Sequence, residues 1–344
     1  ESLTKAIRSL EIGKTGIRNI DNRFINLPKN QLQEEIKTPR PRRIFAILEA
    51  IRRNWPIEDI ASLSKVDLWF LREIEKSFNV NPESTPVSIL KMLGWTDEDL
   101  DSKEIKDDLE NKRAYKLVDT CSAEFLSKTP YLYSTFGTSD DDSASKNKKV
   151  VVIGSGPNRI GQGIEFDYCC VHGVESLKEN NYEAIMINSN PETVSTDYDT
   201  ADKLYFEPLS WDEVKAVLAR EKPDSVIIQL GGQTPLKLAD KISSAGYKIA
   251  GSSLDVIDAT EDRDLFQKLC LSLNIDQPKS KISFNEDELI SAVKEITYPV
   301  LLRPSYVLGG RAMRVVKNDD ELKNYLSILA TADDDGNPFS SGPL

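Results

Sequence analysis

The apolar positions of residues 14 to 136 recur with the period of a helix. Ile44, Ile47, Leu48 and Ile51 stand three and four residues apart, which places them on one face of an amphipathic helix. Few stretches of this region alternate as strands do. The pattern therefore predicts an all-α region over this part of the chain.

A further helix of this region is expected to begin after Asp67, a residue type that caps helix N-termini. Its first turns carry Trp69, Phe70 and Ile74, which are large apolar side chains that we expect to be buried. We interpret Trp69 and Phe70 as a core pair. The region contains no histidine, and we expect no chemistry there.

The pattern changes at residue 150. Residues 150–153 form a continuous apolar run of β-branched type, which is typical of a buried strand, and a glycine-rich loop follows over 154–163. A helix is expected over 164–181 and a second strand over 184–188. This order of strand, helix and strand predicts a parallel sheet that binds ligands at the carboxyl ends of its strands.

A second loop is expected at the same edge of the sheet. The stretch 223–229 is expected to be a strand that leads directly into the loop 230–235, and one more strand ends at 249–251. Because loops after neighbouring parallel strands lie at one edge, the loops 154–163 and 230–235 are expected to converge on one crevice.

The loop 154–163 matches neither common nucleotide motif. Arg159 replaces the third glycine of GxGxxG, and Gln162 and Gly163 replace the Lys and Ser/Thr of a P-loop. Backbone N–H groups at a helix start, with a guanidinium nearby, suit a small anion. The residues expected to line this anion crevice are Asn158, Arg159, Gly161, Gly163, Asn190, Thr193, Gln233 and Thr234. The alternative is a hydrogen-bonded network of loops with a structural role only.

A hairpin follows further along the chain. Residues 298–302 and 312–316 are apolar strands that flank Gly309 and Gly310. An antiparallel pair closed by such a loop can fold its N–H groups over triphosphate oxygens, while a basic residue on the strand, such as the one at position 303, can pair with phosphate charge. The alternative is an ordinary hairpin with a surface arginine.

Composition narrows the classes of function. The 344 residues are 39% hydrophobic and 29% charged, as in ordinary globular proteins, and this length predicts two or three domains. The net charge of −12 argues against a nucleic-acid partner, because phosphate backbones demand clustered Lys and Arg. No apolar run approaches the ~18 residues of a membrane span, so no membrane partner is expected.

The cysteines and the single histidine form no recognisable site. Four cysteines without a disulfide framework indicate a reducing compartment. His172 has no Ser, Cys or carboxylate partner at motif spacing and is interpreted as a helix or core residue. Glu165 and Asp167 stand two apart on the predicted helix, so they point to different faces and form no catalytic pair.

Three long motifs occur in order along the chain. They are GSGPNRIGQGIEFDYCCVH at 154–172, NSNPETVSTDYDTADKLYFEP at 188–208 and QLGGQTPLKLA at 229–239. Together they resemble the large subunit of glutamine-dependent carbamoyl-phosphate synthetase, at the start of the second of its two homologous synthetase halves. The chain also begins without Met, so we expect an internal fragment of a longer protein.

The resemblance implies a domain organisation. The fold class is α/β with an N-terminal all-α domain. The segments are the tail of the first synthetase half (1–13), a helical oligomerisation or connection domain (14–136), a polar solvated linker (137–149), a Rossmann-like pre-ATP-grasp domain (150–260) and a truncated N-terminal lobe of an ATP-grasp domain (261–344). The apolar face of the first helix, formed by Leu3, Ile7 and Leu10, would then have no partner.

The resemblance also implies an activity. Such enzymes make carbamoyl phosphate from bicarbonate, ammonia taken from glutamine, and two ATP, in arginine and pyrimidine biosynthesis, and this half phosphorylates carbamate. The implied ATP-binding residues are Arg263, Arg303, Gly309, Gly310 and Arg311, and the crevice would border the path of carbamate. No catalytic side chain is implied within this chain, and the metal ligands are expected in the remaining ATP-grasp lobe.

The implied cofactors are ATP, Mg²⁺ or Mn²⁺, and K⁺. The implied partners are a glutaminase small subunit or domain and further copies of the chain, bound through the helical domain. The location would be the cytoplasm, or a plastid. By itself this chain is expected not to turn over ATP. Two alternatives remain: another ATP-grasp carboxylase or ligase, similar to biotin carboxylase, and a non-catalytic oligomerisation scaffold.

Overall fold

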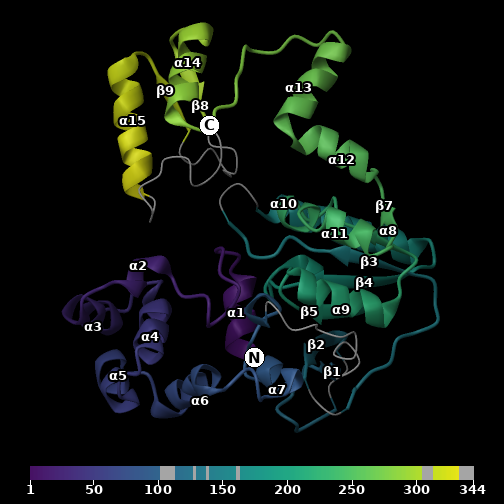
Figure 1. Ribbon diagram of the computed structural model, residues 1–344. Helices are drawn as coiled ribbons and strands as arrows, with labels where there is room; N and C mark the ends of the chain where they lie inside the picture. Colours follow the sequence, from purple (N-terminus) through teal and green to yellow (C-terminus); the bar gives the residue numbers. More distant parts are fainter. Residues whose placement is uncertain (101–112, 127–128, 137–138, 160–162, 304–312, 333–344) are drawn as a thin grey trace. The chain divides into compact units, whose positions relative to one another are not determined.

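The computed structural model describes residues 1–100, 113–126, 129–136, 139–159, 163–303 and 313–332 (Figure 1). The chain divides into two compact units. The first unit comprises Glu1–Asn158 and Ile164–Leu254, and the second comprises Arg159–Gly163 and Asp255–Leu344.

The first unit opens with a helical region. Its helices are α1 (Ser2–Ser9), α2 (Asn22–Ile25), α3 (Lys29–Lys37), α4 (Arg43–Arg52), α5 (Ile57–Ser64), α6 (Leu68–Asn79), α7 (Val87–Met92) and the 3-10 helix η1 (Glu98–Leu100). The core forms around α4, where Ile47, Leu48 and Ile51 are buried and Ile44 is partly buried. The predicted amphipathic face of this helix is therefore confirmed.

Helix α1 contradicts the expectation of an unpartnered apolar face. Ile7 is buried and Leu3 is partly buried in the same core as α4, and only Leu10 is exposed. Helix α1 therefore completes the core of the helical region. Burial of its apolar side chains is favourable because it removes their surface from water.

The other face of α1 binds the α/β part of the first unit. Lys5 Nζ lies 3.1 Å from Glu207 Oε1, and Arg8 pairs with Glu213 at 2.8 Å. Both carboxylates are almost fully buried. Buried acids require such partners, so α1 connects the helical region to the sheet.

The prediction that Trp69 and Phe70 form a core pair is wrong. Their exposed fractions are 62% and 57%, and their rings meet edge to face with centroids 5.0 Å apart. A helix turns one stripe to its core, and on α6 this stripe is taken by Leu71, Ile74 and Phe78. The two aromatic side chains lie off that stripe.

The second part of the first unit is a seven-stranded sheet with the order β1-β2-β5-β4-β3-β6-β7. The strands are β1 (Ala114–Leu117), β2 (Tyr131–Thr135), β3 (Lys149–Ile153), β4 (Glu183–Asn188), β5 (Lys203–Phe206), β6 (Ser225–Ile227) and β7 (Ile249–Ala250). Only the β1–β2 pair is antiparallel among these neighbours. The parallel sheet predicted from the strand–helix–strand order is confirmed.

The prediction that residues 14–136 form an all-α region is wrong at the C-terminal end of this range. β1 and β2 lie inside that range, yet they extend the sheet, and β2 pairs with β5. These strands are short and their alternation is weak, so the sequence pattern missed them. Pairing with the sheet satisfies their backbone groups.

The described part of the segment 137–149 is largely exposed, but two of its acidic side chains bind residues of the sheet. Asp140 accepts a hydrogen bond from Tyr115 N at 2.7 Å, and Asp142 binds Lys203 Nζ at 2.7 Å. The acidic side chains that suggested a free linker are instead held by partners on the sheet, which is continuous across this segment.

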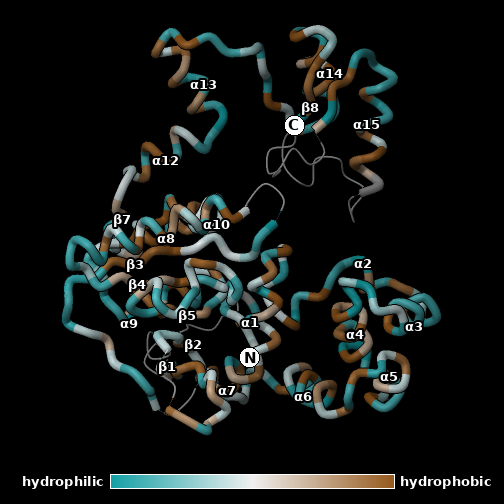
Figure 2. The backbone as a smooth tube through the Cα atoms, turned by 180° about the vertical axis from the view of Figure 1, so that it is seen from behind, coloured by the Kyte–Doolittle hydropathy of each residue, from teal (hydrophilic) through white to brown (hydrophobic). Residues whose placement is uncertain are grey.

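Helices cover both faces of the sheet. Figures 1 and 2 show α8 (Ile164–Glu179), with α10 (Gln233–Leu236) and α11 (Ala239–Ser244), on one side and α9 (Trp211–Glu221) on the other. Cys170 and Val174 of α8 pack against Val152 and Met186 of the strands. This burial on both faces explains the continuous hydrophobic run of β3 in Figure 2.

The second unit contains α12 (Leu254–Glu261), α13 (Arg263–Ser272), α14 (Glu286–Ile296), β8 (Val300–Leu302), β9 (Arg314–Val316) and α15 (Asp319–Ala332). β8 and β9 pair antiparallel, with Val300 opposite Val316 and Leu302 opposite Arg314. The predicted hairpin is confirmed. One face of it packs with α14 and α15, and the other exposes Leu301 and Val315.

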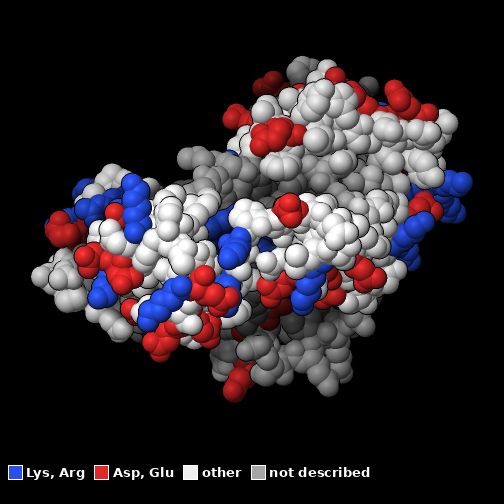
Figure 3. All heavy atoms as spheres, turned by 90° about the horizontal axis from the view of Figure 1, so that it is seen from above, with Lys and Arg blue, Asp and Glu red and all other residues white. Residues whose placement is uncertain are grey.

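Across the described ranges, no helix has both the length and the apolar character that a membrane crossing requires. On the face drawn in Figure 3, basic and acidic side chains of the described residues are interspersed over most of the surface, with a group of basic side chains at the right-hand edge.

Candidate functional site

The loops after β3 and β4 are joined by one buried side chain, Asn188. Its Oδ1 accepts hydrogen bonds from Gly156 N at 3.1 Å and from Ser189 N at 2.8 Å. Its Nδ2 donates to Ser195 Oγ at 3.3 Å. Asn188 thus uses both ends of its amide to fix the glycine loop against the segment after β4.

The loop after β6 reaches the same place. A Cβ atom on Gly231 would lie 2.5 Å from the carbonyl oxygen of Gly154 and 2.6 Å from that of Ile153. Only a glycine permits two backbones to approach so closely. The predicted approach of the loop after β3 to the loop after β6 is confirmed at Gly154 and Gly231.

Helix α8 supplies a buried carboxylate behind this crevice. Asp167 is fully buried, and its Oδ2 accepts a hydrogen bond from Ser195 N at 3.0 Å. Glu165, two residues earlier, is exposed. The prediction that these two acids point to different faces is confirmed, and Asp167 has a positioning contact with the segment after β4.

Sequence reasoning missed one residue of the crevice, Glu11. It follows α1, and its Oε2 accepts a hydrogen bond from Thr234 Oγ1 at 2.7 Å. Its Oε1 would lie 2.4 Å from a Cβ atom on Gly156, whose φ is +71°. A carboxylate from the helical end of the chain therefore lies between the two loops. No sequence signal near Glu11 predicts this, because the contact spans more than 200 positions.

The predicted crevice residues differ in their placement. Asn158 and Gln233 are exposed, Arg159 and Gly163 are half-buried, and Gly161 lies outside the described residues. Thr193 and Thr234 are buried, and Asn190 is half-buried with its Oδ1 accepting from Glu192 N at 3.0 Å. The structure brings Thr234 into contact with Glu11, while Asn190 caps its own turn.

Cys170 and His172, both on α8, are not paired with each other. Burial raises the pKa of the Cys170 thiol to about 12, which keeps it protonated at neutral pH. His172 is exposed, with its Nδ1 2.9 Å from Glu175 Oε2 and its ring against Tyr168. Within the described ranges, no cluster of three or more His, Cys, Asp and Glu side chains is arranged to hold a metal. Positioning and charge are what this crevice can supply.

Of the predicted ATP-binding residues, two are described. Arg303 is exposed and follows β8 directly, and Arg263 is half-buried at the first position of α13. Asp262 caps that helix by accepting from Leu265 N at 2.9 Å. Gly309, Gly310 and Arg311 lie outside the described residues.

Three family models match consecutive parts of the chain. Residues 1–102 match the oligomerisation domain of the carbamoyl-phosphate synthetase large chain, 146–259 match the carbamoyl phosphate synthase preATP-grasp domain, and 262–337 match the ATP binding domain of the carbamoyl-phosphate synthase L chain. The chain belongs to the carbamoyl-phosphate synthetase large-chain family. The resemblance of the three sequence motifs is confirmed.

Curated relatives in this family are similar over most of the chain. It is 43% identical to the carbamoyl phosphate synthase large chain of Archaeoglobus fulgidus over 95% of its length. It is 45% identical to that of Clostridium acetobutylicum over 96%. In both comparisons it spans 32% of the relative, so the chain covers about a third of the large chains that it matches.

A solved structure with a weaker likeness is the biotin carboxylase domain of Hydrogenobacter thermophilus 2-oxoglutarate carboxylase, in complex with MgADP, ADP and bicarbonate. It is 20% identical with a TM-score of 0.41, over 56% of this chain and 44% of that one.

Proposed function

We propose that this chain contributes the helical domain and the beginning of the second synthetase half to a carbamoyl-phosphate synthetase, and that this half phosphorylates carbamate with ATP. The observation that carries the proposal is the order of the three matched domains on one chain. The glutamine-dependent reaction, with ammonia from a glutaminase subunit or domain, belongs to the same proposal. It is supported by the similarity of the chain to large chains of carbamoyl phosphate synthase.

The β8–β9 hairpin is the proposed start of the nucleotide site. Leu301 and Val315 are exposed at 58% and 53% on the face opposite the α14–α15 core. The two-residue alternation places Arg303 on the face of Leu301. An apolar strand face beside a guanidinium fits an adenine ring and phosphate oxygens. We extend the proposal to Arg263, Gly309, Gly310 and Arg311 as further ATP contacts.

The crevice of the first unit is the proposed place of a small carboxylate substrate. Its role would be orientation through backbone N–H groups of the loops, without a covalent intermediate. The hydroxyl of Thr234 already donates to Glu11. Charge on the phosphates would be neutralised by arginine and by a divalent cation, Mg²⁺ or Mn²⁺, which supplies electrostatic stabilisation when it is bound. The ligands of that cation, and any K⁺ site, belong in this proposal to the remaining ATP-grasp lobe.

The proposal is tested with a chimera of the Clostridium acetobutylicum large chain in which this chain replaces the segment it matches. We expect the chimera to make carbamoyl phosphate from ammonia, bicarbonate and ATP. Arg303→Ala should lower kcat/KM for ATP in the carbamate step by about 10- to 100-fold, because a charge-assisted hydrogen bond to phosphate is lost.

The matched control is Arg314→Ala. Arg314 is also exposed on the hairpin, but it pairs opposite Leu302, whose face α14 and α15 cover. It should leave the ATP dependence within about twofold of the parent. Equal losses from both variants, or none from Arg303→Ala, would remove Arg303 from the ATP site.

Self-association through the helical region is the second part of the proposal. The match of 1–102 to an oligomerisation domain supports a second copy as the partner. Trp69 and Phe70 form the proposed contact, because they are large, adjacent and exposed on α6. Aromatic residues at the centre of an interface carry much of its binding energy.

Trp69→Ala should weaken self-association by about 30-fold, the effect of losing about 2 kcal/mol at an interface hot spot. Sedimentation velocity over a concentration series measures it. Tyr198→Ala, which removes an aromatic side chain 68% exposed elsewhere in the first unit, is the control and should change nothing. Unaltered association of the Trp69 variant would show that this face is not the contact.

The proposed compartment is a reducing one, the cytoplasm or a plastid. All four cysteines are free, and two of them, Cys170 and Cys270, are buried. Free buried thiols fit a reducing environment.

A further inference from the structure

Helix α1 lies at the carboxyl ends of the parallel strands in the first unit. At its N-terminal end, Glu1 Oε2 accepts a hydrogen bond at 3.0 Å from Thr135 Oγ1, at the end of β2. One turn later, Lys5 Nζ donates at 3.1 Å to Oε1 of Glu207, directly after β5. Because the carboxyl ends of parallel strands meet at one edge of a sheet, both contacts lie at the edge that carries the crevice.

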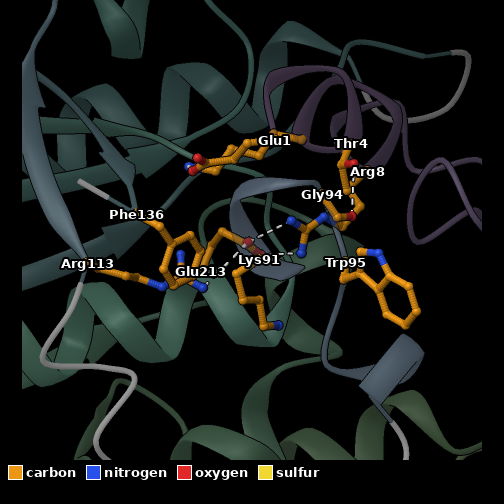
Figure 4. A pocket seen from close by; sticks show the side chains of 10 residues that line it. Glu1, Thr4, Arg8, Lys91, Gly94, Trp95, Arg113, Phe136 and Glu213 are labelled. Carbon is orange, nitrogen blue, oxygen red and sulfur yellow. Dashed lines mark hydrogen bonds and ion pairs between the residues drawn. The ribbon is translucent and has the colours of Figure 1, made fainter. Parts of the chain in front are cut away.

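An ion pair fixes the next turn of α1. The guanidinium of Arg8 binds both carboxylate oxygens of Glu213, at the start of α9, at 2.9 Å and 2.8 Å. Figure 4 shows this pair in a pocket that Arg113 also lines, with Arg113 Nη2 3.9 Å from the same carboxylate. Glu213 is buried, and a buried carboxylate requires such partners. The position of α1 is therefore fixed by contacts outside the crevice loops.

Glu11 follows this helix in a backbone conformation that suits glycine better. Its φ is +50°, in the left-handed region that glycine usually occupies after the end of a helix. For a residue with a Cβ atom this conformation is strained, and it persists only where the surroundings hold it. A strained glutamate at a position that favours glycine indicates a role for its side chain.

That side chain lies between the two loops of the crevice. Its Oε2 accepts a hydrogen bond at 2.7 Å from Thr234 Oγ1, in the loop after β6. Its Oε1 is shielded from solvent and would lie 2.4 Å from a Cβ atom on Gly156, in the loop after β3. Because Gly156 has no Cβ atom, the carboxylate can approach the backbone of the glycine loop closely. A carboxylate of the chain itself thus lies in the crevice that suits a small anion.

We propose that Glu11 is an internal ligand of the crevice, and that its carboxylate occupies the place of a small carboxylate substrate until that substrate displaces it. This inference rests on the function proposed above for the crevice. A planar carboxylate that accepts O–H and N–H hydrogen bonds is the group that both ligands share. The helix can stay in place while the Glu11 side chain rotates away, because Lys5 and Arg8 anchor it.

An internal ligand lowers the apparent affinity for an external one. The apparent dissociation constant is the intrinsic constant divided by the fraction of molecules whose crevice is open. If the Glu11 carboxylate fills the crevice in about nine of ten molecules, an external carboxylate binds about tenfold more weakly. Repulsion between the two negative charges acts in the same direction.

Thermal unfolding of the full chain in sodium acetate, compared with sodium chloride at equal ionic strength, tests the inference. Acetate is the small carboxylate probe, and its binding to the folded chain should raise the melting temperature of the first unit. We expect Glu11→Gly to reach the half-maximal shift at about tenfold less acetate than wild type. Glycine favours a φ of +50°, so this variant should fold. If it does not, Glu11→Gln, which keeps the size of the side chain without its charge, should also need less acetate than wild type.

Two variants are matched controls, and both should need as much acetate as wild type. Lys65→Gly makes the same backbone change at the end of α5, where Lys65 has a φ of +60°. Asp59→Asn removes one negative charge from an exposed side chain of α5. Equal acetate dependence of wild type and Glu11→Gly overturns the internal ligand and leaves the anion crevice in place. If acetate acts on neither protein, the anion crevice and its internal ligand are both overturned.

Discussion

Asn188→Ala is expected to lower the melting temperature of the first unit by about 8 °C. The substitution deletes the acceptor of Gly156 N and Ser189 N and the donor to Ser195 Oγ, all at a fully buried position. Leaving buried backbone donors unsatisfied lowers the free energy of unfolding by about 3 kcal/mol in total. For a unit of this size, each kcal/mol lost lowers the melting temperature by about 2–4 °C. Differential scanning calorimetry measures the shift.

The matched comparison for Asn188 is Asn190→Ala. Asn190 is half-buried and caps only its own turn, by accepting a hydrogen bond from Glu192 N. We therefore expect Asn190→Ala to lower the free energy of unfolding by about 1 kcal/mol. Asn188→Asp, which retains the acceptor oxygen but adds a buried charge, should also be strongly destabilised. If Asn188→Ala melts no lower than Asn190→Ala, the amide does not hold the two loops together.

Gly231→Ala is expected to lower the free energy of unfolding of the first unit by at least about 3 kcal/mol. The new methyl group would lie 2.5 Å and 2.6 Å from two backbone carbonyl oxygens, those of Gly154 and Ile153. Neither oxygen is the end of a flexible side chain, so relief requires the loops after β3 and β6 to separate. Calorimetry of the first unit should show the lowered transition, and reduced soluble yield would accompany it.

A glycine in open space separates the clash from other effects of adding a methyl group. Gly246 has a φ of +85° and nothing within 4 Å of its Cβ position, so Gly246→Ala reports backbone strain alone, about 1 kcal/mol. A Gly231 variant as stable as the Gly246 variant would mean that the two loops do not depend on their close approach.

The helical region and the sheet are connected through one helix and one turn. On α1, Lys5 and Arg8 bind buried acids of the sheet, and Glu11 beyond it reaches Thr234 in the crevice. After α7, Asp97 contacts Asp212. Movement of the helical region relative to the sheet would break these contacts, of which the one between Glu11 and Thr234 lies at the crevice.

Some features followed from short stretches of sequence. The apolar run of β3, the helix α8 and the strand β4 were predicted within a few residues, because a strand buried on both faces needs a continuous run of apolar side chains. Asp67 was predicted as an N-cap, and its Oδ1 accepts from Trp69 N at 2.8 Å. Such features depend on neighbours within four residues.

Other features depended on competition between distant parts. Trp69 and Phe70 have the hydrophobicity of core residues, but Leu71 and Ile74 occupy the one stripe of α6 that the core accommodates. The acidic segment after residue 138 has the composition of a free linker, but Asp140 and Asp142 bind residues of the sheet. Composition alone cannot predict a contact with a residue that is distant in the chain.

By itself, the sequence determined the family, the parallel sheet and the two loops at its carboxyl edge, because each is encoded in continuous runs of residues whose local preferences agree. Only the tertiary structure decided that Glu11 enters the crevice, that β1 and β2 join the sheet and that the turn after α7 contacts Asp212 of α9. The contacts of Glu11 and Asp212 join residues 223 and 115 positions apart in the chain. Their energy depends on which surfaces meet after folding, and no local pattern records that.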